Sequence, residues 1–149
     1  MITWKSKFFT ELSTLEIYKI IQLRSEVFIV EQNCIYQDCD DKDLKAYHYC
    51  GWEDENLAAY SRLFDTGISY PNAASIGRVL TSPSVRRKNV GKELMNRSII
   101  EIYHLFGKVP IQISAQRYLK RFYESFSFVQ KSGIYMEDGI EHISMFRDV

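Results

Sequence analysis

The chain has 149 residues, the size of one ordinary domain. It is 46% hydrophobic and 26% charged, a composition that excludes disordered, collagen-like and membrane-spanning classes. Its 19 Lys and Arg residues balance its 19 Asp and Glu residues. This balance argues against nucleic acid or an anionic membrane as the main partner, because both attract an excess of positive charge. Any anion that the protein binds must therefore meet a local group of cations.

The cysteines and the N-terminus favour a reducing location. Three cysteines, Cys34, Cys39 and Cys50, are an odd number in a chain large enough to fold without disulfides. The first residues contain no continuous apolar stretch like that of a signal peptide. We therefore expect a cytoplasmic protein.

The first half of the chain predicts one helix and four strands. Residues 2–5 form a short strand, and a capping box of Ser13 and Glu16 opens an amphipathic helix that runs to about Phe28. An aspartate-rich loop follows over Cys34–Lys45. The remaining expected elements are a hairpin of residues 47–53 and 57–64, a turn over 66–72, and a strand over 75–82 that Pro83 ends.

The second half predicts two further helices and three strands. Apolar residues at helical spacing run from Val90 to Phe106, and Gly107 provides a left-handed end. A strand over 109–114 and a helix over 116–126 come next. Strands over 128–137 and 140–147 then flank Asp138-Gly139, a strong hairpin signal. With no repeat or linker, the order indicates one mixed α/β domain over residues 1–149.

A basic turn between a strand and the second long helix predicts an anion site. The first N–H groups of a helix are unpaired and lie at the positive end of its dipole. Asn89 tolerates left-handed backbone, and Gly91 allows close approach of an anion. The cations there are Arg86, Arg87, Lys88 and Lys92. The turn therefore predicts a diphosphate site, with an ordinary solvated turn as the alternative.

The segment is not a nucleotide P-loop, although Gly91-Lys92 matches part of one. That motif requires Ser or Thr after the lysine and a glycine five positions before Gly91. The chain has Glu93 and Arg86 there.

Three stretches resemble the GCN5-related N-acetyltransferase (GNAT) family. Arg86-x-x-Asn89-x-Gly91 resembles its coenzyme signature, and Leu119-x-x-Phe122-Tyr123-Glu124-x-Phe126-x-Phe128 its second motif. Arg24-x-x-Val27-Phe28-x-x-Glu31-Gln32 and the C-terminal Asp138-Gly139-Ile140-x-His142-Ile143-x-Met145 are similar to the ElaA-like branch. The resemblance implies a mostly antiparallel sheet of about seven strands, flanked by helices and splayed between the fourth and fifth strands.

The resemblance also implies the reaction, which is direct transfer of an acetyl group from acetyl-CoA to the amine of a small molecule or peptide, without a metal. The edge of the fourth strand would hold the pantetheine arm, with the amide near Leu80 as oxyanion donor. The coenzyme-binding residues that it implies are Val79, Leu80, Thr81, Arg86, Arg87, Lys88, Asn89, Val90, Gly91, Lys92, Gln116 and Tyr123. Asn89 and Ser127 replace usual glycines, and Gln116 replaces a common asparagine.

The catalytic residues follow from the chemistry of aminolysis. Tyr123 is the candidate general acid, because a phenol with a pKa of about 10 can protonate a thiolate; its alternative role is an aromatic core residue. Two residues are candidate general bases. Glu31 qualifies if partial burial raises its pKa, and His142 qualifies by its ordinary pKa near 6.5. Structural roles for both, with a water relay as the base, are the alternative.

Several alternatives stay open from the sequence. The acidic loop is most simply solvated, and the other readings are attraction of a cationic amine or binding of a metal. A coenzyme-binding module without turnover and an acyl-homoserine lactone synthase-like enzyme are the rival functions. The apolar C-terminal strands either close a homodimer or complete the sheet of a monomer.

Overall fold

Eight strands and three α-helices make up the computed structural model, which describes residues 1–149. The helices are α1 (Thr14–Arg24), α2 (Val90–Phe106) and α3 (Lys120–Glu124). The strands are β1 (Thr3–Phe8), β2 (Tyr47–Glu53), β3 (Asn56–Phe64), β4 (Ser75–Thr81), β5 (Ile111–Gln116), β6 (Val129–Gln130), β7 (Tyr135–Glu137) and β8 (Ile140–Arg147). The predicted order of elements is confirmed.

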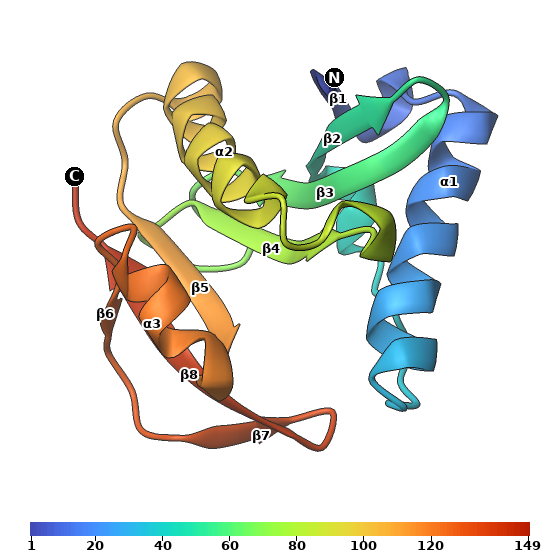
Figure 1. Ribbon diagram of the computed structural model, residues 1–149. Coiled ribbons are helices and arrows are strands. Elements are labelled where there is room, and N and C mark those ends of the chain that lie inside the picture. Colours follow the sequence, from blue (N-terminus) through green and yellow to red (C-terminus); the bar gives the residue numbers. More distant parts are fainter.

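The strands form two sheets that meet at one end (Figure 1). The first is antiparallel in the order β1-β2-β3-β4, and the second has β8 between β5 and β6, with β7 also paired to β8. The junction is one parallel bridge between Ala74 and Ile111. Beyond it β4 and β5 separate, as the family resemblance implied. The expected seven strands are eight because the segment 128–137 contains two short strands.

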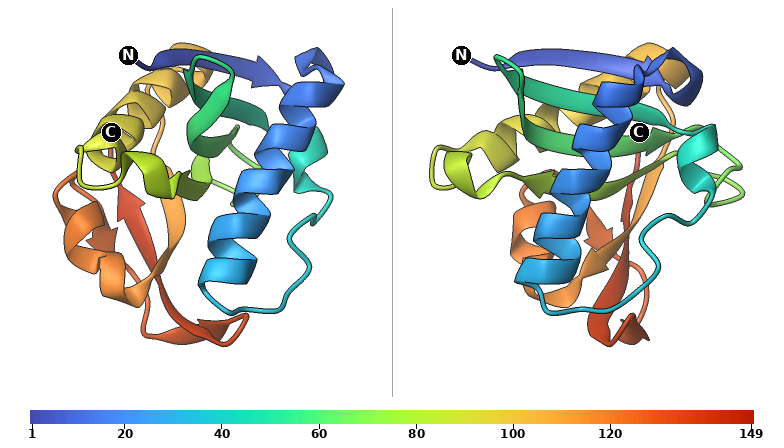
Figure 2. Two further views of the ribbon diagram at one scale, coloured as in Figure 1. Left: turned by 45° about the vertical axis from the view of Figure 1, so that its right-hand side comes forward. Right: turned by 90° about the vertical axis from the view of Figure 1, so that its right-hand side faces the viewer.

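The two long helices cover opposite faces of the first sheet (Figure 2). Ser61 of β3 hydrogen-bonds Ser98 of α2, whereas its neighbour Tyr60 is buried with Leu23 of α1. The larger core lies under α2 and continues into the second sheet through Phe128 and Ile143. Alternation along β3 thus provides one apolar surface for each helix.

Local signals set the helix ends. The Ser13 side chain accepts from the Glu16 amide, and the Glu16 carboxylate accepts from the Ser13 amide, so the predicted capping box is confirmed. Gly107 ends α2 with a φ of +84°, also as predicted. The first helix extends beyond the expected end at Phe28, because a π-helical segment over Ser25–Glu31 continues it.

Two predicted elements of the second half have different bounds in the structure. The strand expected over 109–114 is β5 (Ile111–Gln116), displaced by two residues at each end. The helix expected over 116–126 is a 3₁₀ turn, Arg117–Leu119, followed by the short α3. No helix of the protein has the length and apolar character needed to cross a bilayer.

Candidate functional site

A cavity of about 430 Å³ opens where β4 and β5 diverge. Its walls are β4, β5, the π-helical segment, the turn before α3 and the β7–β8 hairpin. Volumes of this order are usual for small-molecule sites. Because only Ala74 and Ile111 bridge the two strands, most of the facing edges of β4 and β5 have no partner strand. A ligand lying here can therefore bond to main-chain groups.

One extra residue in β4 widens this cavity. Tyr60 pairs with Leu80 and Arg62 with Gly77, so three steps along β4 oppose two along β3. The bulge contains Arg78, whose φ is +50°. Its guanidinium donates to the Asp38 side chain at 2.9 Å and to the Asp38 carbonyl oxygen at 3.0 Å. A side chain 40 residues away thus holds the strained position in place.

The three β4 positions expected to face the coenzyme lie beside this bulge. Val79, Leu80 and Thr81 all line the cavity. Gln116, at the end of β5, lines it from the other side and donates to the Gln32 side chain at 3.4 Å. The structure therefore places these four residues around one cavity.

The basic turn leads into α2 with an unusual run of free amides. None of the six backbone N–H groups from Arg87 to Lys92 donates to a protein acceptor. Arg87 and Asn89 both have left-handed backbone, with φ of +67° and +60°, so the expected conformation of Asn89 is confirmed. Nothing lies within 4 Å of where a side chain at Gly91 would begin. Successive free amides at a helix start are a suitable site for a phosphate group.

The cations of this turn do not all face the same way. Arg87, Lys88, Asn89 and Lys92 are exposed, and Val90 is buried in the core. The Arg86 guanidinium instead forms two hydrogen bonds, of 2.8 and 2.6 Å, with the Glu31 carboxylate. The pair joins the end of the π-helical segment to the basic turn at the wall of the cavity.

The Arg86–Glu31 pair shifts the pKa of Glu31 in the direction opposite to the one expected. The hydrogen bonds from Arg86 hold the pKa of Glu31 below its usual value, although slight burial acts the other way. The sequence argument required burial to raise it. Glu31 therefore lacks the property that made it a candidate base.

Tyr123 lies on α3, with its side chain in the cavity wall. Burial raises the pKa of the phenol above its ordinary value. Its hydroxyl has no hydrogen-bond partner in the protein, and its ring packs edge-on against Phe122 and Phe128. The ring therefore has the core packing considered as the alternative role, and the side chain also lines the cavity, so its role as general acid stays a prediction.

His142 lies across the cavity on β8, with a side chain only 8% exposed. Its Nδ1 lies 2.8 Å from the Ile140 carbonyl oxygen, which can only accept, so Nδ1 carries a proton. Its Nε2 lies 3.3 Å from Oε2 of Glu137. In the neutral ring, Nε2 is the nitrogen free to accept a proton.

The acidic loop is only partly solvated, which differs from its simplest interpretation: Asp41 is exposed, but the other three aspartates are paired. Asp38 pairs with Arg24 and Arg78, and Asp43 lies 2.8 Å from Arg24. The remaining partner is Arg62, which contacts Asp40 at 2.6 Å and Asp43 at 2.9 Å. The arginines thus occupy three of the four carboxylates that amine attraction or metal binding in this loop would use. The loop instead packs against β3 and β4 and supports the bulge.

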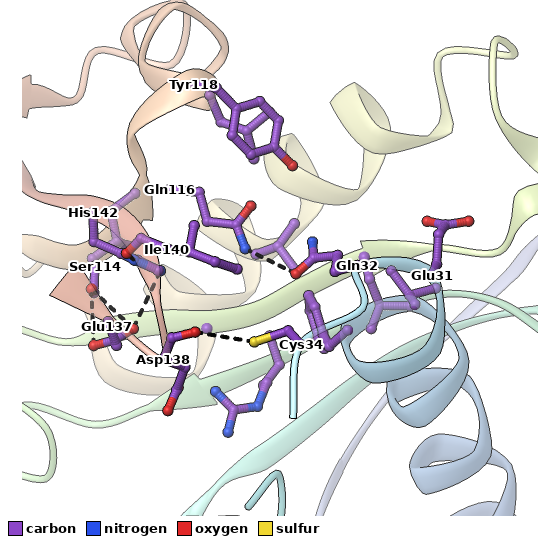
Figure 3. Close-up of a pocket in the computed structure, with 18 of the residues that line it drawn as sticks. Glu31, Gln32, Cys34, Ser114, Gln116, Tyr118, Glu137, Asp138, Ile140 and His142 are labelled. Atoms are coloured by element: carbon purple, nitrogen blue, oxygen red, sulfur yellow. Dashed lines mark hydrogen bonds and ion pairs between the residues drawn. The ribbon is translucent and has the colours of Figure 1, made fainter. Parts of the chain in front are cut away.

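The sequence argument missed several polar residues of the cavity (Figure 3). Ser114 of β5 lies 3.4 and 3.5 Å from the Glu137 carboxylate oxygens, and the Tyr135 hydroxyl lies 2.5 Å from Ser114 Oγ. Cys34 donates to the Asp138 carbonyl oxygen across the cavity at 3.2 Å. The hairpin signal at Asp138-Gly139 was visible in the sequence. The β5–β8 pairing that brings Ser114 toward Glu137 was not.

Comparison with known proteins agrees with this geometry. The family model described as "Acetyltransferase (GNAT) domain" matches residues 16–148. The chain belongs to the GNAT family. The ElaA protein of Escherichia coli is 40% identical to this GNAT chain, with 100% of the chain and 98% of ElaA covered.

Solved structures support the same assignment. An acyl-CoA N-acyltransferase from Pseudomonas aeruginosa superposes with a TM-score of 0.94 at 38% identity, covering 99% of both chains. The E. coli ElaA structure gives 0.91 at 39% identity and covers 99% of this chain and 100% of ElaA. A Bacillus subtilis acetyltransferase, solved in complex with CoA, shares the GNAT fold with a TM-score of 0.68 at 18% identity and coverage of 100% and 99%. The chain is thus an ElaA-like GNAT protein with an acyl-CoA acyltransferase fold.

Proposed function

We propose that the protein is an N-acetyltransferase that moves an acetyl group from acetyl-CoA to the amine of a small molecule or peptide. The observation that carries the proposal is the run of six unpaired amides, Arg87 to Lys92, which follows β4 and the 3₁₀ turn Pro83–Val85 and leads into α2. A diphosphate at these amides directs the pantetheine arm of the same molecule along β4. The CoA complex of the B. subtilis relative supports this choice of ligand.

The chain's own groups then orient the thioester. Main-chain groups on the free edge of β4, around Val79 to Thr81, bond to the amides of the pantetheine arm. The Leu80 amide region, next to the bulge, is the proposed donor to the carbonyl oxygen as it becomes negative. Such a fixed donor stabilises the transition state without reorganisation. The Arg78–Asp38 pair maintains the shape of this edge.

Protons move through His142 and Tyr123. His142 Nε2 accepts one proton from the ammonium form of the acceptor. The amine nitrogen then bonds to the thioester carbon, the carbon–sulfur bond breaks, and Tyr123 protonates the sulfur while recovering the second proton from nitrogen. We prefer His142 to Glu31 as the base because Arg86 occupies the Glu31 carboxylate.

The three free cysteines are consistent with a reducing compartment, so we propose that the enzyme works in the cytoplasm. Cys50 is buried, and Cys34 is engaged with Asp138.

Coenzyme binding tests the proposed site. Isothermal titration with CoA should give one site per chain. The double variant Arg87→Glu, Lys88→Glu should weaken binding by roughly tenfold or more, because two like charges then face the diphosphate. Lys108→Glu, an exposed lysine just beyond the far end of α2, is the matched control and should bind normally. Unchanged affinity in the double variant would place the diphosphate elsewhere.

A further inference from the structure

The end of the cavity opposite α3 holds a group of hydrogen-bond acceptors that the coenzyme does not explain. Glu137 and Asp138 belong to the β7–β8 hairpin, His142 to β8 and Ser114 to β5 (Figure 3). The register that pairs Tyr135 with His142, and His142 with Gln116, brings these elements together.

The hydrogen bonds within this group leave two atoms that can accept from a ligand, Nε2 of His142 and the carboxylate of Glu137. Because Nδ1 of His142 donates to the Ile140 carbonyl, the neutral ring presents the lone pair of Nε2 toward Glu137, 3.3 Å from Oε2. Ser114 is the other side chain that hydrogen-bonds the Glu137 carboxylate, at 3.4 and 3.5 Å. When the ring is charged, Nε2 donates to Glu137; when the ring is neutral, Nε2 and the carboxylate are two neighbouring acceptors that N–H groups of a ligand can serve. A group that donates to both, such as an ammonium, fits this position.

The charges around the cavity also favour a cationic ligand. Two cations line it, and both are already paired: Arg78 with Asp38 and Asp40, and Arg86 with Glu31. Glu137 and Asp138 have no lysine or arginine partner. Even with His142 charged, the two carboxylates give the hairpin end of the cavity a net negative charge, which attracts cations and repels carboxylates.

We propose that Glu137, with His142, binds the acceptor as an ammonium and selects cationic alkylamines, including diamines and polyamines, over amino acids. This deepens the proposed function and rests on it. Glu137 holds the ammonium, and His142 Nε2 accepts its proton before the nitrogen attacks. A carboxylate on the acceptor would meet Glu137 and Asp138 and lose affinity by like-charge repulsion.

Three amines of equal length test the proposal: diaminobutane, butylamine and γ-aminobutyrate, each with acetyl-CoA and a thiol-release readout. The wild type should acetylate diaminobutane and butylamine at least about tenfold more efficiently, in kcat/KM, than γ-aminobutyrate. Glu137→Gln should raise the KM for diaminobutane by about tenfold or more and narrow this preference, because a charged hydrogen bond becomes neutral. Glu137→Asp, which retains the charge, should keep the preference.

Glu141→Gln is the matched control. Glu141 lies on the same hairpin, its side chain is 49% exposed like that of Glu137, and it pairs with Arg117. It should leave KM and the preference unchanged. Equal efficiency for all three amines, or the same KM in Glu137→Gln as in Glu141→Gln, would overturn the inference. Bound CoA without thiol release for any amine would instead overturn the proposed function.

Discussion

At the scale of single residues, Tyr123 is the most specific catalytic assignment. Its burial raises the pKa of the phenol, so the group is protonated throughout the working pH range. Tyr123→Phe removes only the hydroxyl and keeps the ring in its contacts with Phe122 and Phe128. We expect kcat to fall by about 100-fold while CoA affinity is unchanged, since general acid catalysis contributes on that order.

Tyr118 also lines the cavity and is exposed, so Tyr118→Phe is the control. Steady-state kinetics of the two variants will show which hydroxyl contributes to turnover. Full turnover in Tyr123→Phe would end the assignment. Loss of turnover in Tyr118→Phe alone would move the acid to that residue.

Glu31 provides the opposite prediction. Because Arg86 lowers its pKa and occupies its carboxylate, Glu31 is not expected to accept the amine proton. Glu31→Gln should therefore keep kcat and the acid limb of the pH–rate profile. His142→Gln should lower kcat by about 100-fold. A profile that loses its acid limb in Glu31→Gln would return the role of base to Glu31.

At the scale of elements, the acidic segment and the β4 bulge act as one unit. Asp38 contacts Arg24, whose side chain is 1% exposed, and Arg78 in the bulge. Removing one partner of a buried ion pair leaves an uncompensated charge, which typically costs about 3–5 kcal/mol. Asp38→Asn should therefore lower the free energy of unfolding by about 3 kcal/mol, as measured by urea denaturation.

The same variant should impair the site at permissive temperature. Arg78 then keeps only the Asp38 carbonyl oxygen and Asp40 as partners, so the β4 edge is held less firmly, and we expect a lower kcat with a normal diphosphate site. Lys42→Ala, an exposed change in the same segment, is the control. Wild-type stability in Asp38→Asn would show that this pair does not support the fold.

Elements with local causes were predictable from the sequence. Ser13 and Glu16 start α1, Gly107 ends α2, and Asp138-Gly139 forms the last hairpin, each through groups a few residues apart. The packing of the acidic segment was not predictable, because its partners Arg62 and Arg78 lie on β3 and β4 and meet it only in the folded chain.

The candidate site also has one part that was predictable from a local motif and one part that depends on the fold. The proposed coenzyme part is a contiguous stretch around Asn89 and Gly91, which a sequence motif can describe. Glu137, Ser114 and His142 converge through the pairing of β8 with β5 and β7, and no spacing in the sequence indicates that register. Arg86 was predicted to face a diphosphate, and only the fold brings Glu31 within reach of it.

At the scale of the whole molecule, the arginine–aspartate network predicts acid sensitivity. Burial alone would raise the pKa of Asp43, but Arg24 and Arg62 outweigh it and leave the value below the ordinary one; Arg62 and Arg78 act likewise on Asp40. A carboxyl with a lowered folded pKa stabilises the fold above its unfolded pKa of about 3.9, and this is lost as pH falls toward the folded value. Urea unfolding should show a steady loss of stability below about pH 4 and little change between pH 5 and 7. A flat profile down to pH 2.5 would contradict this role of the network.

The fold explains how a chain with no net charge can still present locally charged surfaces. The acidic segment is neutralised internally by three arginines, and the basic turn keeps exposed cations at the free amides of α2. Arg86, the first cation of that turn, lines the cavity between the sheets, and Glu137 and Asp138 of the hairpin line it as well. The proposed anion site and the proposed cation site thus lie at the same cavity or next to it, as a two-substrate transfer requires.

The central claim is amine-dependent turnover of acetyl-CoA. The direct measurement is release of the CoA thiol on addition of a panel of alkylamines, polyamines and short peptides, with the product identified by mass spectrometry. The account predicts one thiol released for each amine that gains an acetyl group. Binding of CoA without thiol release above hydrolysis for any member of the panel would contradict it and identify a coenzyme-binding module without turnover.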